Sequence, residues 1–236
     1  MNMTGQILCE HGKNLAECEI CGDSYPSQLL SWLGYRRFVA KIGTYHLTAV
    51  VGCLRRTFYD FTQPESETLR SLWMKQRGRM LHMITHAFGW RELPVCMQLE
   101  YGGRTVELVG HVDAYDPNKG VVYEFKTTSH LPWQLESGKL PHVHHVNQIR
   151  GYDVLLSNYG LCVNQLELWY MDDLTPPTKI IVQRENIKEW LVDRTKALHK
   201  SLLDNEEPAS EPSYICKYCL FSGTCKPRFR YTHQLT

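Results

Sequence analysis

The chain has 236 residues, of which 43% are hydrophobic and 22% are charged, and its formal net charge is +1 at pH 7. These values are typical of an ordinary soluble globular protein that can bury a core of its own. No apolar run approaches the roughly 18 residues of a membrane span, and the N-terminus lacks the apolar segment of a signal peptide. The composition thus argues against a membrane or secreted protein, and we expect a cytoplasmic location with no membrane partner.

The first segment is rich in potential metal ligands. The chain contains nine cysteines, and without a signal peptide these favour metal binding over disulfides. In CEHGKNLAECEICG, Cys9, His11, Cys18 and Cys21 supply a complete tetrahedral ligand set for zinc. Residues 1–24 are therefore predicted to form a zinc knuckle, because the segment is too short for a core of its own.

The next part of the chain is basic. Between Gly34 and Arg91 there are ten Lys or Arg residues against three acids, although the net charge of the whole chain is close to zero. This local surplus could contact the phosphate backbone of DNA. Arginines scattered over a solvated surface are the alternative interpretation.

The hydrophobic pattern from residue 64 onward predicts a mixed α/β domain. Apolar residues at helical spacing indicate a long helix over 64–88, with Gly78 as a weak point. The further elements expected are strands at about 95–101, 105–115 and 121–128, a helix at about 141–158 after a loop, strands near 161–171 and 179–183, and a helix at about 185–204. This order predicts a small mixed sheet flanked by helices, and we assign it to one domain over 25–204.

The segment GHVDAYDPNKGVVYEFKTT carries the strongest chemical signal. DPNKG is a turn sequence, so the strands on either side should form an antiparallel hairpin. Because side chains alternate along a strand, Glu124 and Lys126 point to one face and Phe125 to the other. If pairing places Asp113 beside them, two carboxylates and an ammonium converge, and a divalent cation would compensate the like charges. A solvated hairpin with a surface ion pair is the alternative.

Polar residues on two helices could join this cluster. Gln148 and Tyr152 lie four residues apart and share a helix face, although they could also be plain helix surface. His82 follows Gly78 by four residues and could be a metal ligand. Alternatively, His82 is a buried core histidine, or the nearby His86 is the ligand. The histidines at 142, 144 and 145 are placed in a loop before the helix, where we expect them to be solvated or to face DNA.

The chain ends in a second cysteine group. Cys216, Cys219 and Cys225 follow the linker-like sequence NEEPASEPS and would need a fourth ligand. We treat residues 205–236 as a linker and metal-binding tail. Two further cysteines, Cys96 and Cys162, lie in apolar stretches and are expected to be small buried residues.

Four short motifs together resemble the RecB-like branch of the PD-(D/E)XK nuclease superfamily. They are G78-R-M-L-H82, G110-H-V-D113, E124-F-K126 and Q148-I-R-G-Y152, in this order over about 75 residues. The resemblance implies a restriction-endonuclease-like core in which Asp113, Glu124, the Phe125 carbonyl and His82 hold Mg²⁺ or Mn²⁺. It further implies that Lys126 orients the attacking water and stabilises the transition state, with Gln148 and Tyr152 in support.

The segment V50-V-G-C53-L-R-R-T-F-Y59 looks like the "CPRxFY" signature of CRISPR-associated RecB-like exonucleases of the Cas-four family. In that family an early cysteine joins three late ones around a 4Fe-4S cluster, which here implies Cys53 with Cys216, Cys219 and Cys225. Without the resemblance, the same four thiolates suit zinc equally well. Two departures stand out: Leu54 replaces the usual proline, and the Cys9 to Cys21 knuckle has no counterpart.

The expected function is a metal-dependent DNA exonuclease that acts on single strands. The resemblance implies 5′ to 3′ polarity and a partnership with the CRISPR integrase complex, in which such enzymes trim prespacers. The alternatives are a viral or cellular repair or recombination exonuclease outside CRISPR, and a non-catalytic DNA-binding adaptor. The Asp113, Glu124 and Lys126 set argues against the adaptor.

Overall fold

The computed structural model describes residues 7–9, 11, 13–15, 18, 19, 21, 29, 32, 41–63 and 67–225. The strands are β1 (Ile7–Leu8), β2 (Thr44–His46), β3 (Glu67–Thr68), β4 (Trp90–Tyr101), β5 (Arg104–Asp116), β6 (Val121–Thr127), β7 (Gln165–Met171) and β8 (Thr178–Val182). The helices are α2 (Leu47–Val51), α3 (Leu54–Thr62), α4 (Leu69–Leu81), α5 (Leu131–Glu136), α6 (Val143–Asn158) and α7 (Lys188–Asp204), with the 3-10 helices η2 (His82–Ala87) and η3 (Tyr214–Tyr218).

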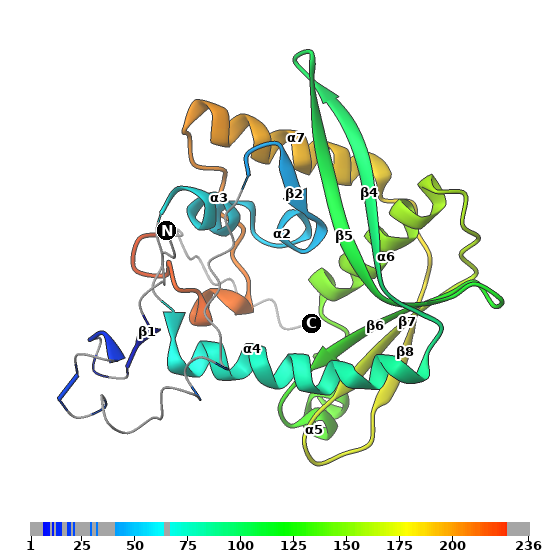
Figure 1. Cartoon of the computed structure of the whole chain (residues 1–236), viewed down its shortest axis with the longest axis horizontal. Coiled ribbons are helices and arrows are strands. Elements are labelled where there is room, and N and C mark those ends of the chain that lie inside the picture. Colours follow the sequence, from blue (N-terminus) through cyan, green and yellow to red (C-terminus); the bar gives the residue numbers. More distant parts are fainter. Residues whose placement is uncertain are drawn as a thin grey trace.

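The main sheet is mixed, and its strands follow the order β2-β5-β6-β7-β8, with β4 also paired to β5. The β2–β5 and β6–β7 pairs are parallel, and the other pairs are antiparallel. The long β4–β5 hairpin projects from one end of the sheet (Figure 1). Its turn contains Gly102 and Gly103, both at positive φ, a backbone conformation that favours glycine.

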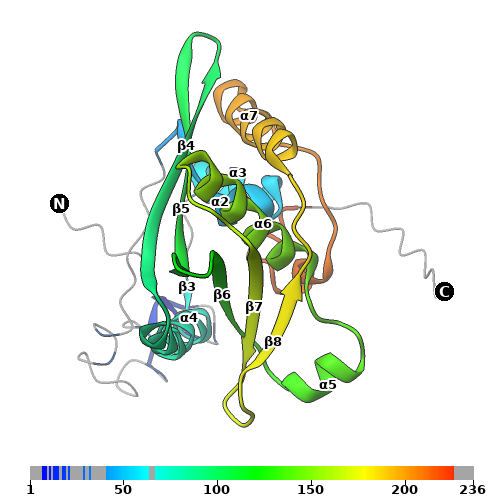
Figure 2. The same ribbon diagram turned by 90° about the vertical axis from the view of Figure 1, so that its right-hand side faces the viewer.

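Helices cover both faces of this sheet. The larger core lies between the sheet and α2, α3, α6 and α7, and it includes Val122 and Leu168. A smaller core on the other face contains Tyr123 and Phe125 and packs against Phe88, just after η2. Figure 2 shows α4 and α7 on opposite sides of the strands. The predicted small mixed sheet flanked by helices is confirmed.

The tail returns to the helices near the start of the domain. Arg194 of α7 donates to the carbonyl oxygens of Val50 and Gly52 and also binds the Glu211 carboxylate. Glu211 in turn accepts a 2.9 Å hydrogen bond from the backbone N–H of Leu54. The segment before α3 and the tail are therefore held side by side, as Figure 1 also shows for α3 and the last described residues.

Several expected elements differ from those observed. The helix predicted over 64–88 runs through Gly78 and changes to the 3-10 helix η2 at His82, so the break comes one turn later than the glycine. The short elements β2, α2, α3 and α5 were not predicted. The helix expected at about 141–158 runs from Val143 to Asn158, and His144 and His145, which we placed in a loop before it, lie in its first turn.

One burial prediction is also wrong. Cys162 is exposed and Cys96 is only partly buried, because Cys162 follows the turn after α6 and precedes β7. Its thiol contacts Asn164, and the Cys96 thiol contacts the Tyr159 hydroxyl at 3.0 Å. An apolar stretch of sequence was therefore not sufficient to predict that these two thiols are buried.

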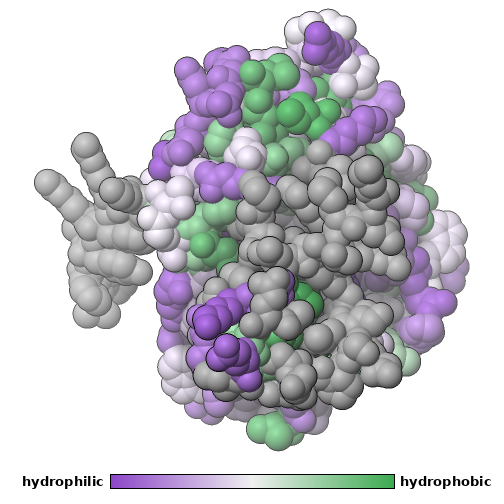
Figure 3. Space-filling view, turned by 60° about the vertical axis from the view of Figure 1, so that its left-hand side comes forward, coloured by the Kyte–Doolittle hydropathy of each residue, from purple (hydrophilic) through white to green (hydrophobic). Residues whose placement is uncertain are grey.

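Hydrophilic and hydrophobic side chains are interspersed on the described part of the face seen in Figure 3. Among the described residues, none of the helices combines the length and the apolar character that crossing a membrane requires.

Candidate active site

The candidate site forms where the hairpin ladder ends. The register between β5 and β6 runs from Asp116↔Val121 to Ala114↔Tyr123, as the DPNKG turn predicted. Two residues beyond Tyr123, the backbone N–H of Phe125 donates instead to the Asp113 carboxylate at 2.8 Å. The aspartate thus takes up a backbone donor that the ladder no longer uses, and this contact fixes Asp113 beside the Glu124 position.

Glu124 and Lys126 meet Gln148 of α6 on the same face of the sheet. The Lys126 ammonium lies 2.6 Å from Glu124 Oε1 and 2.9 Å from Gln148 Oε1. Gln148 Nε2 donates to Glu124 Oε1 at 2.7 Å and to the Tyr152 hydroxyl at 3.3 Å. The amide therefore points its oxygen at the cation and its nitrogen at the carboxylate. Gln148 and Tyr152 are buried, so they are not plain helix surface.

Glycine lets this helix approach the strand. A Cβ atom built on Gly110 would lie only 2.8 Å from a ring carbon of Tyr152, closer than real Cβ contacts allow. Gly110 therefore permits the Tyr152 ring to pack against β5, three residues before Asp113. This is the physical reason for a glycine at the start of the G110-H-V-D113 motif.

The Glu124 carboxyl is an unusual group in this cluster. Its side chain is 1% exposed, and burial raises its pKa to about 8, with the Lys126 charge lowering the pKa and the Asp113 charge raising it. Its second oxygen, Oε2, is buried and has no hydrogen-bond partner among the described residues. A buried carboxylate oxygen without a partner is costly, whereas a divalent cation with hard oxygen ligands would satisfy it. The donor set therefore fits Mg²⁺ or Mn²⁺.

The histidines divide into three groups. His82 begins η2, but its side chain lies outside the described part of the structure, so its predicted ligand role stays a prediction. His86 is exposed, and its Nδ1 lies 2.5 Å from an Arg91 guanidinium nitrogen. A cation so close makes His86 an unsuitable metal ligand.

The third group is His142, His144 and His145 at the start of α6, where the three rings contact one another. His142 stacks on His144 and on Tyr214 of the tail, with centroids 5.7 and 4.4 Å apart. His145 contacts the Tyr170 hydroxyl at 2.9 Å, and burial lowers its pKa far below the ordinary value. We expected these three side chains to be solvated or to face DNA. All three are partly buried, and His142 and His145 line a groove that is described below.

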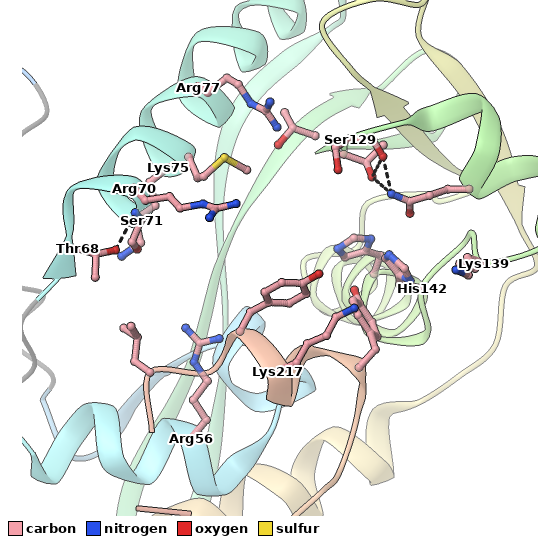
Figure 4. A pocket seen from close by; sticks show the side chains of 18 of the residues that line it. Arg56, Thr68, Arg70, Ser71, Lys75, Arg77, Ser129, Lys139, His142 and Lys217 are labelled. Atoms are coloured by element: carbon pink, nitrogen blue, oxygen red, sulfur yellow. Dashed lines mark hydrogen bonds between the residues drawn. The ribbon is translucent and has the colours of Figure 1, made fainter. Parts of the chain in front are cut away.

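A groove of about 1380 Å³ opens beside this site. We call it the basic groove, because its lining, among the described residues, includes six Lys or Arg residues and a single acid, Asp60. The cations are Arg56, Arg70, Lys75, Arg77, Lys139 and Lys217. Figure 4 shows Arg70 and Arg77 reaching in from α4, with Lys217 of the tail on the opposite wall. Thr127, the residue after Lys126, also lines the groove.

The N-terminal ligand set is compact. The ligand atoms of Cys9, His11, Cys18 and Cys21 all lie within 4.8 Å of one another, and the three thiols are 3.4 to 3.8 Å from His11 Nδ1. Burial, together with the Cys18 and Cys9 thiols, raises the pKa of Cys21 to about 11. These residues could hold a metal ion. They pack against Leu69 at the start of α4, and β1 pairs with β3.

The second cysteine set is more open. The N-terminal set is the only group, in the part of the chain that the structure describes, in which at least three His, Cys, Asp or Glu ligand atoms lie within 4.8 Å of one another. Cys53, which caps α3, nevertheless lies near the tail. Burial raises the pKa of Cys219, and the nearby thiols of Cys53 and Cys216 raise it further. Cys225 packs partly buried against the main core, and its N–H donates to Phe221.

The family model of the PD-(D/E)XK nuclease superfamily matches residues 45–226. The match spans most of the chain and includes Asp113, Glu124 and Lys126. The chain therefore belongs to the PD-(D/E)XK nuclease superfamily. The comparison with curated proteins found no match.

One solved structure shares this fold, and two others are similar to a smaller extent. The crystal structure of SSO0001 is 21% identical, with a TM-score of 0.60, and the alignment covers 86% of this chain and 94% of that one. An alkaline exonuclease (LHK-Exo) from Laribacter hongkongensis is 13% identical with a TM-score of 0.46, over 72% and 92%. A phage related exonuclease from Haemophilus somnus 129PT is 12% identical with a TM-score of 0.43, over 69% and 94%.

Part of the basic groove was not anticipated. The surplus of cations before Arg91 was noted, and four of the cations in the groove come from it. Four other lining residues, Trp133, Lys139, Lys217 and Tyr218, were not singled out. They come from segments about 80 residues apart, so no local spacing could have indicated that they share a groove.

Proposed function

We propose that the protein is a metal-dependent exodeoxyribonuclease that degrades single-stranded DNA from the 5′ end. The observation that carries this proposal is the buried Oε2 of Glu124, next to Asp113 and Lys126, which has no hydrogen-bond partner in the part of the chain that the structure describes. Membership of a nuclease superfamily supports the reaction type. The single-strand preference and the polarity rest on the resemblance to CRISPR-associated RecB-like exonucleases.

Asp113, Glu124 and the Phe125 carbonyl would hold Mg²⁺ or Mn²⁺, with His82 as a nitrogen ligand. When bound, such a cation acidifies a water molecule and screens the scissile phosphate. Glu124 must be ionised to bind it, and its pKa of about 8 means that binding releases a proton below that pH. Asp113 is held in place by the Phe125 N–H, so one ligand position is fixed before the cation arrives.

Lys126 would orient the attacking water and stabilise the negative charge that develops on the phosphate. Gln148 holds the ammonium by accepting its hydrogen bond, so the lysine need not search for its position. Burial keeps the pKa of Tyr152 well above its ordinary value, which leaves the hydroxyl protonated. Gln148 and Tyr152 thus act as positioning residues around Lys126 and Glu124.

The basic groove would lead the strand to this site. Its cations suit a phosphate backbone, and its lining reaches Thr127, adjacent to Lys126. His145, one turn before Gln148 on α6, lines the same groove. A strand that follows the groove would therefore bring its phosphates to the carboxylates.

The cysteines would serve two different inorganic groups. Cys9, His11, Cys18 and Cys21 suit Zn²⁺, which tetrahedral thiolate and imidazole ligands bind at short distances. Cys53, Cys216, Cys219 and Cys225 would bind a 4Fe-4S cluster, which needs a wider cage than one ion does; the more open arrangement of these thiols supports this assignment. We accordingly divide the chain into a zinc knuckle (1–24), a nuclease domain (25–204) and a cluster-binding tail (205–236) joined to Cys53.

The CRISPR integrase complex is the proposed partner, and trimming of prespacers the proposed task. Support comes from the Cys53 to Tyr59 segment and its resemblance to the family signature. A repair or recombination nuclease outside CRISPR would use the same site. An integration assay with the purified integrase complex distinguishes these two functions: only a CRISPR nuclease should yield DNA that is both trimmed and integrated.

The reaction itself is tested with oligonucleotides labelled at one end, single- or double-stranded, in Mn²⁺, in Mg²⁺ and with no added divalent ion. A 5′ label on a single strand should appear at once in the shortest products, and a 3′ label in a ladder of shortening strands. Glu124→Gln, which keeps shape but loses charge, should be inactive. If the wild-type protein binds the strand but leaves it intact with either ion, it is an adaptor and not a nuclease.

A further inference from the structure

Two exposed aromatic rings face the basic groove from different elements. Trp133 of α5 is 55% exposed and Tyr218 at the end of η3 is 70% exposed, and both line the groove. Much of their large apolar surface is not covered by other side chains. Exposed aromatic rings in a charged groove are the usual stacking platforms of proteins that bind single-stranded nucleic acid.

Each ring carries a lysine. The Lys139 ammonium lies 3.6 Å from the centroid of the Trp133 ring, and the Lys217 ammonium lies 4.8 Å from that of Tyr218. A cation over one ring face restricts the ring's position. The ring also offers a surface for a base, while the ammonium offers a charge for a phosphate. Each pair therefore supplies the two contacts that a single nucleotide needs.

The pairs also have a suitable location relative to the site. The α5 pair follows the Thr127 to His130 segment, which lines the groove directly after Lys126. The η3 pair lies on the tail, whose Tyr214 stacks on His142 of α6 at 4.4 Å. Figure 4 shows Lys139 and Lys217 with His142 between them at one end of the groove.

We propose that Trp133 with Lys139, and Tyr218 with Lys217, are two nucleotide-binding subsites that select a single strand by stacking on its unpaired bases. This inference rests on the proposed function and adds the residues that set its substrate class. In a duplex the bases are already stacked and paired, so the rings have no base face to contact, whereas the lysines attract both substrates. Charge complementarity draws DNA into the groove, and the rings then distinguish single strands.

The test compares two strands that have the same phosphates. One is oligothymidine about twelve nucleotides long, within the usual site sizes, and the other is an abasic strand of equal length. Binding is measured by fluorescence anisotropy without added divalent ion. Trp133→Ala and Tyr218→Ala should each weaken oligothymidine binding on the order of tenfold, as loss of a stacked base does. Binding of the abasic strand should change by less than about twofold.

Three controls separate stacking from other effects. Trp133→Phe keeps a ring and should bind oligothymidine more tightly than Trp133→Ala does. If DNA quenches the tryptophan fluorescence of the wild-type protein, the quenching should be smaller in both variants, because the indole is absent. Lys139→Ala should weaken the binding of both strands, because it removes a charge that attracts the phosphates of each. Trp90→Ala alters an exposed tryptophan, 49% exposed, that is not among the groove's lining residues and should change neither affinity.

The stacking proposal is overturned if both ring variants bind oligothymidine as tightly as the wild-type protein, or if they weaken both strands equally. This outcome is separable from failure of the proposed function. A wild-type protein that cleaves no DNA refutes the nuclease, yet the ratio of oligothymidine to abasic affinity still decides whether the rings stack on bases.

Discussion

The carboxylate site and the two cysteine sets are held in the fold in different ways. Asp113, Glu124 and Lys126 lie in paired strands, so the register of one hairpin places them. The first cysteine set lies near the start of the described chain, and three members of the second lie near its end. Cys53 is held beside the tail because Arg194 binds both the Gly52 carbonyl and the Glu211 carboxylate. The difference suggests a division of work: the sheet supplies the chemistry, and the cysteines fasten the ends. Changes in the two regions should therefore have separable effects on turnover and on stability.

The largest effect is expected from the tail. Cys53→Ser and Cys225→Ser should each lower the free energy of unfolding by about 4 to 5 kcal/mol before strain, because the proposed cluster would close a loop of about 160 residues. Both should also lose absorbance near ~400 nm, expected of a thiolate-bound cluster. Denaturant unfolding and absorbance spectra measure these changes.

Cys162→Ser is the matched control, since this thiol is exposed; it should keep both colour and stability. If Cys53→Ser keeps its full iron content and a tail protected from protease, then the fourth ligand lies elsewhere, and the tail is not fastened as described.

The next effect falls on turnover. Lys126→Ala should lower the cleavage rate on the order of 100-fold, because it would remove the proposed donor to the transition state, while affinity for the strand should be nearly unchanged. Lys179→Ala is a matched control: Lys179 also pairs with a buried glutamate, Glu167, at 3.3 Å, but lies on β8 away from the site. Equal rates for both variants would remove Lys126 from the mechanism.

A pH effect should distinguish the site from the rest of the sheet. The folded-state pKa of Glu124, about 8, lies above its ordinary value of 4.5. Between these values the folded protein retains a proton that the unfolded chain has lost. Without a divalent ion, the free energy of unfolding should therefore fall as pH rises from about 4.5 to about 8. Urea unfolding across this window should give a flatter curve for Glu124→Gln; parallel curves would mean that Glu124 is not the group responsible.

The smallest effect on turnover is expected at the N-terminal set. Cys18→Ser should remove about one zinc per chain, because Cys18 is one of four clustered ligands. The cleavage rate on a short oligonucleotide should stay within about twofold of the wild-type rate, since these residues contact α4 near Leu69 and lie apart from the carboxylates. Zinc analysis and rate assays measure this. A variant that retains zinc but loses activity would contradict the division between the regions.

The fold and the site could be predicted where local signals agree. The turn DPNKG and strand alternation placed Asp113, Glu124 and Lys126 together, since register follows from a tight turn. We expected the weak point of the long helix at Gly78, because glycine has a low helix propensity. The helix instead changes to η2 at His82, since tertiary contacts override the propensity of a single residue. Strand β2 has only three residues, and it pairs with a part of β5 more than sixty residues away.

The basic groove could be predicted only in part. Its cations from Arg56 to Arg77 lie in one basic stretch, but Trp133, Lys139, Lys217 and Tyr218 reach it from distant segments. Likewise, the pairing of Arg194 with Glu211 depends on where α7 ends and how the tail turns. Long-range closure of this kind leaves no periodic signal in the sequence.

The central claim is that the buried carboxylates await a divalent cation, and Mn²⁺ binding tests it most directly. Calorimetric titration of the zinc-loaded protein should reveal one Mn²⁺ site per chain that is lost in Glu124→Gln and retained in Cys18→Ser. Affinity should increase as pH approaches about 8, because Glu124 must lose its proton. Equal Mn²⁺ binding by the wild-type protein and Glu124→Gln would contradict the account.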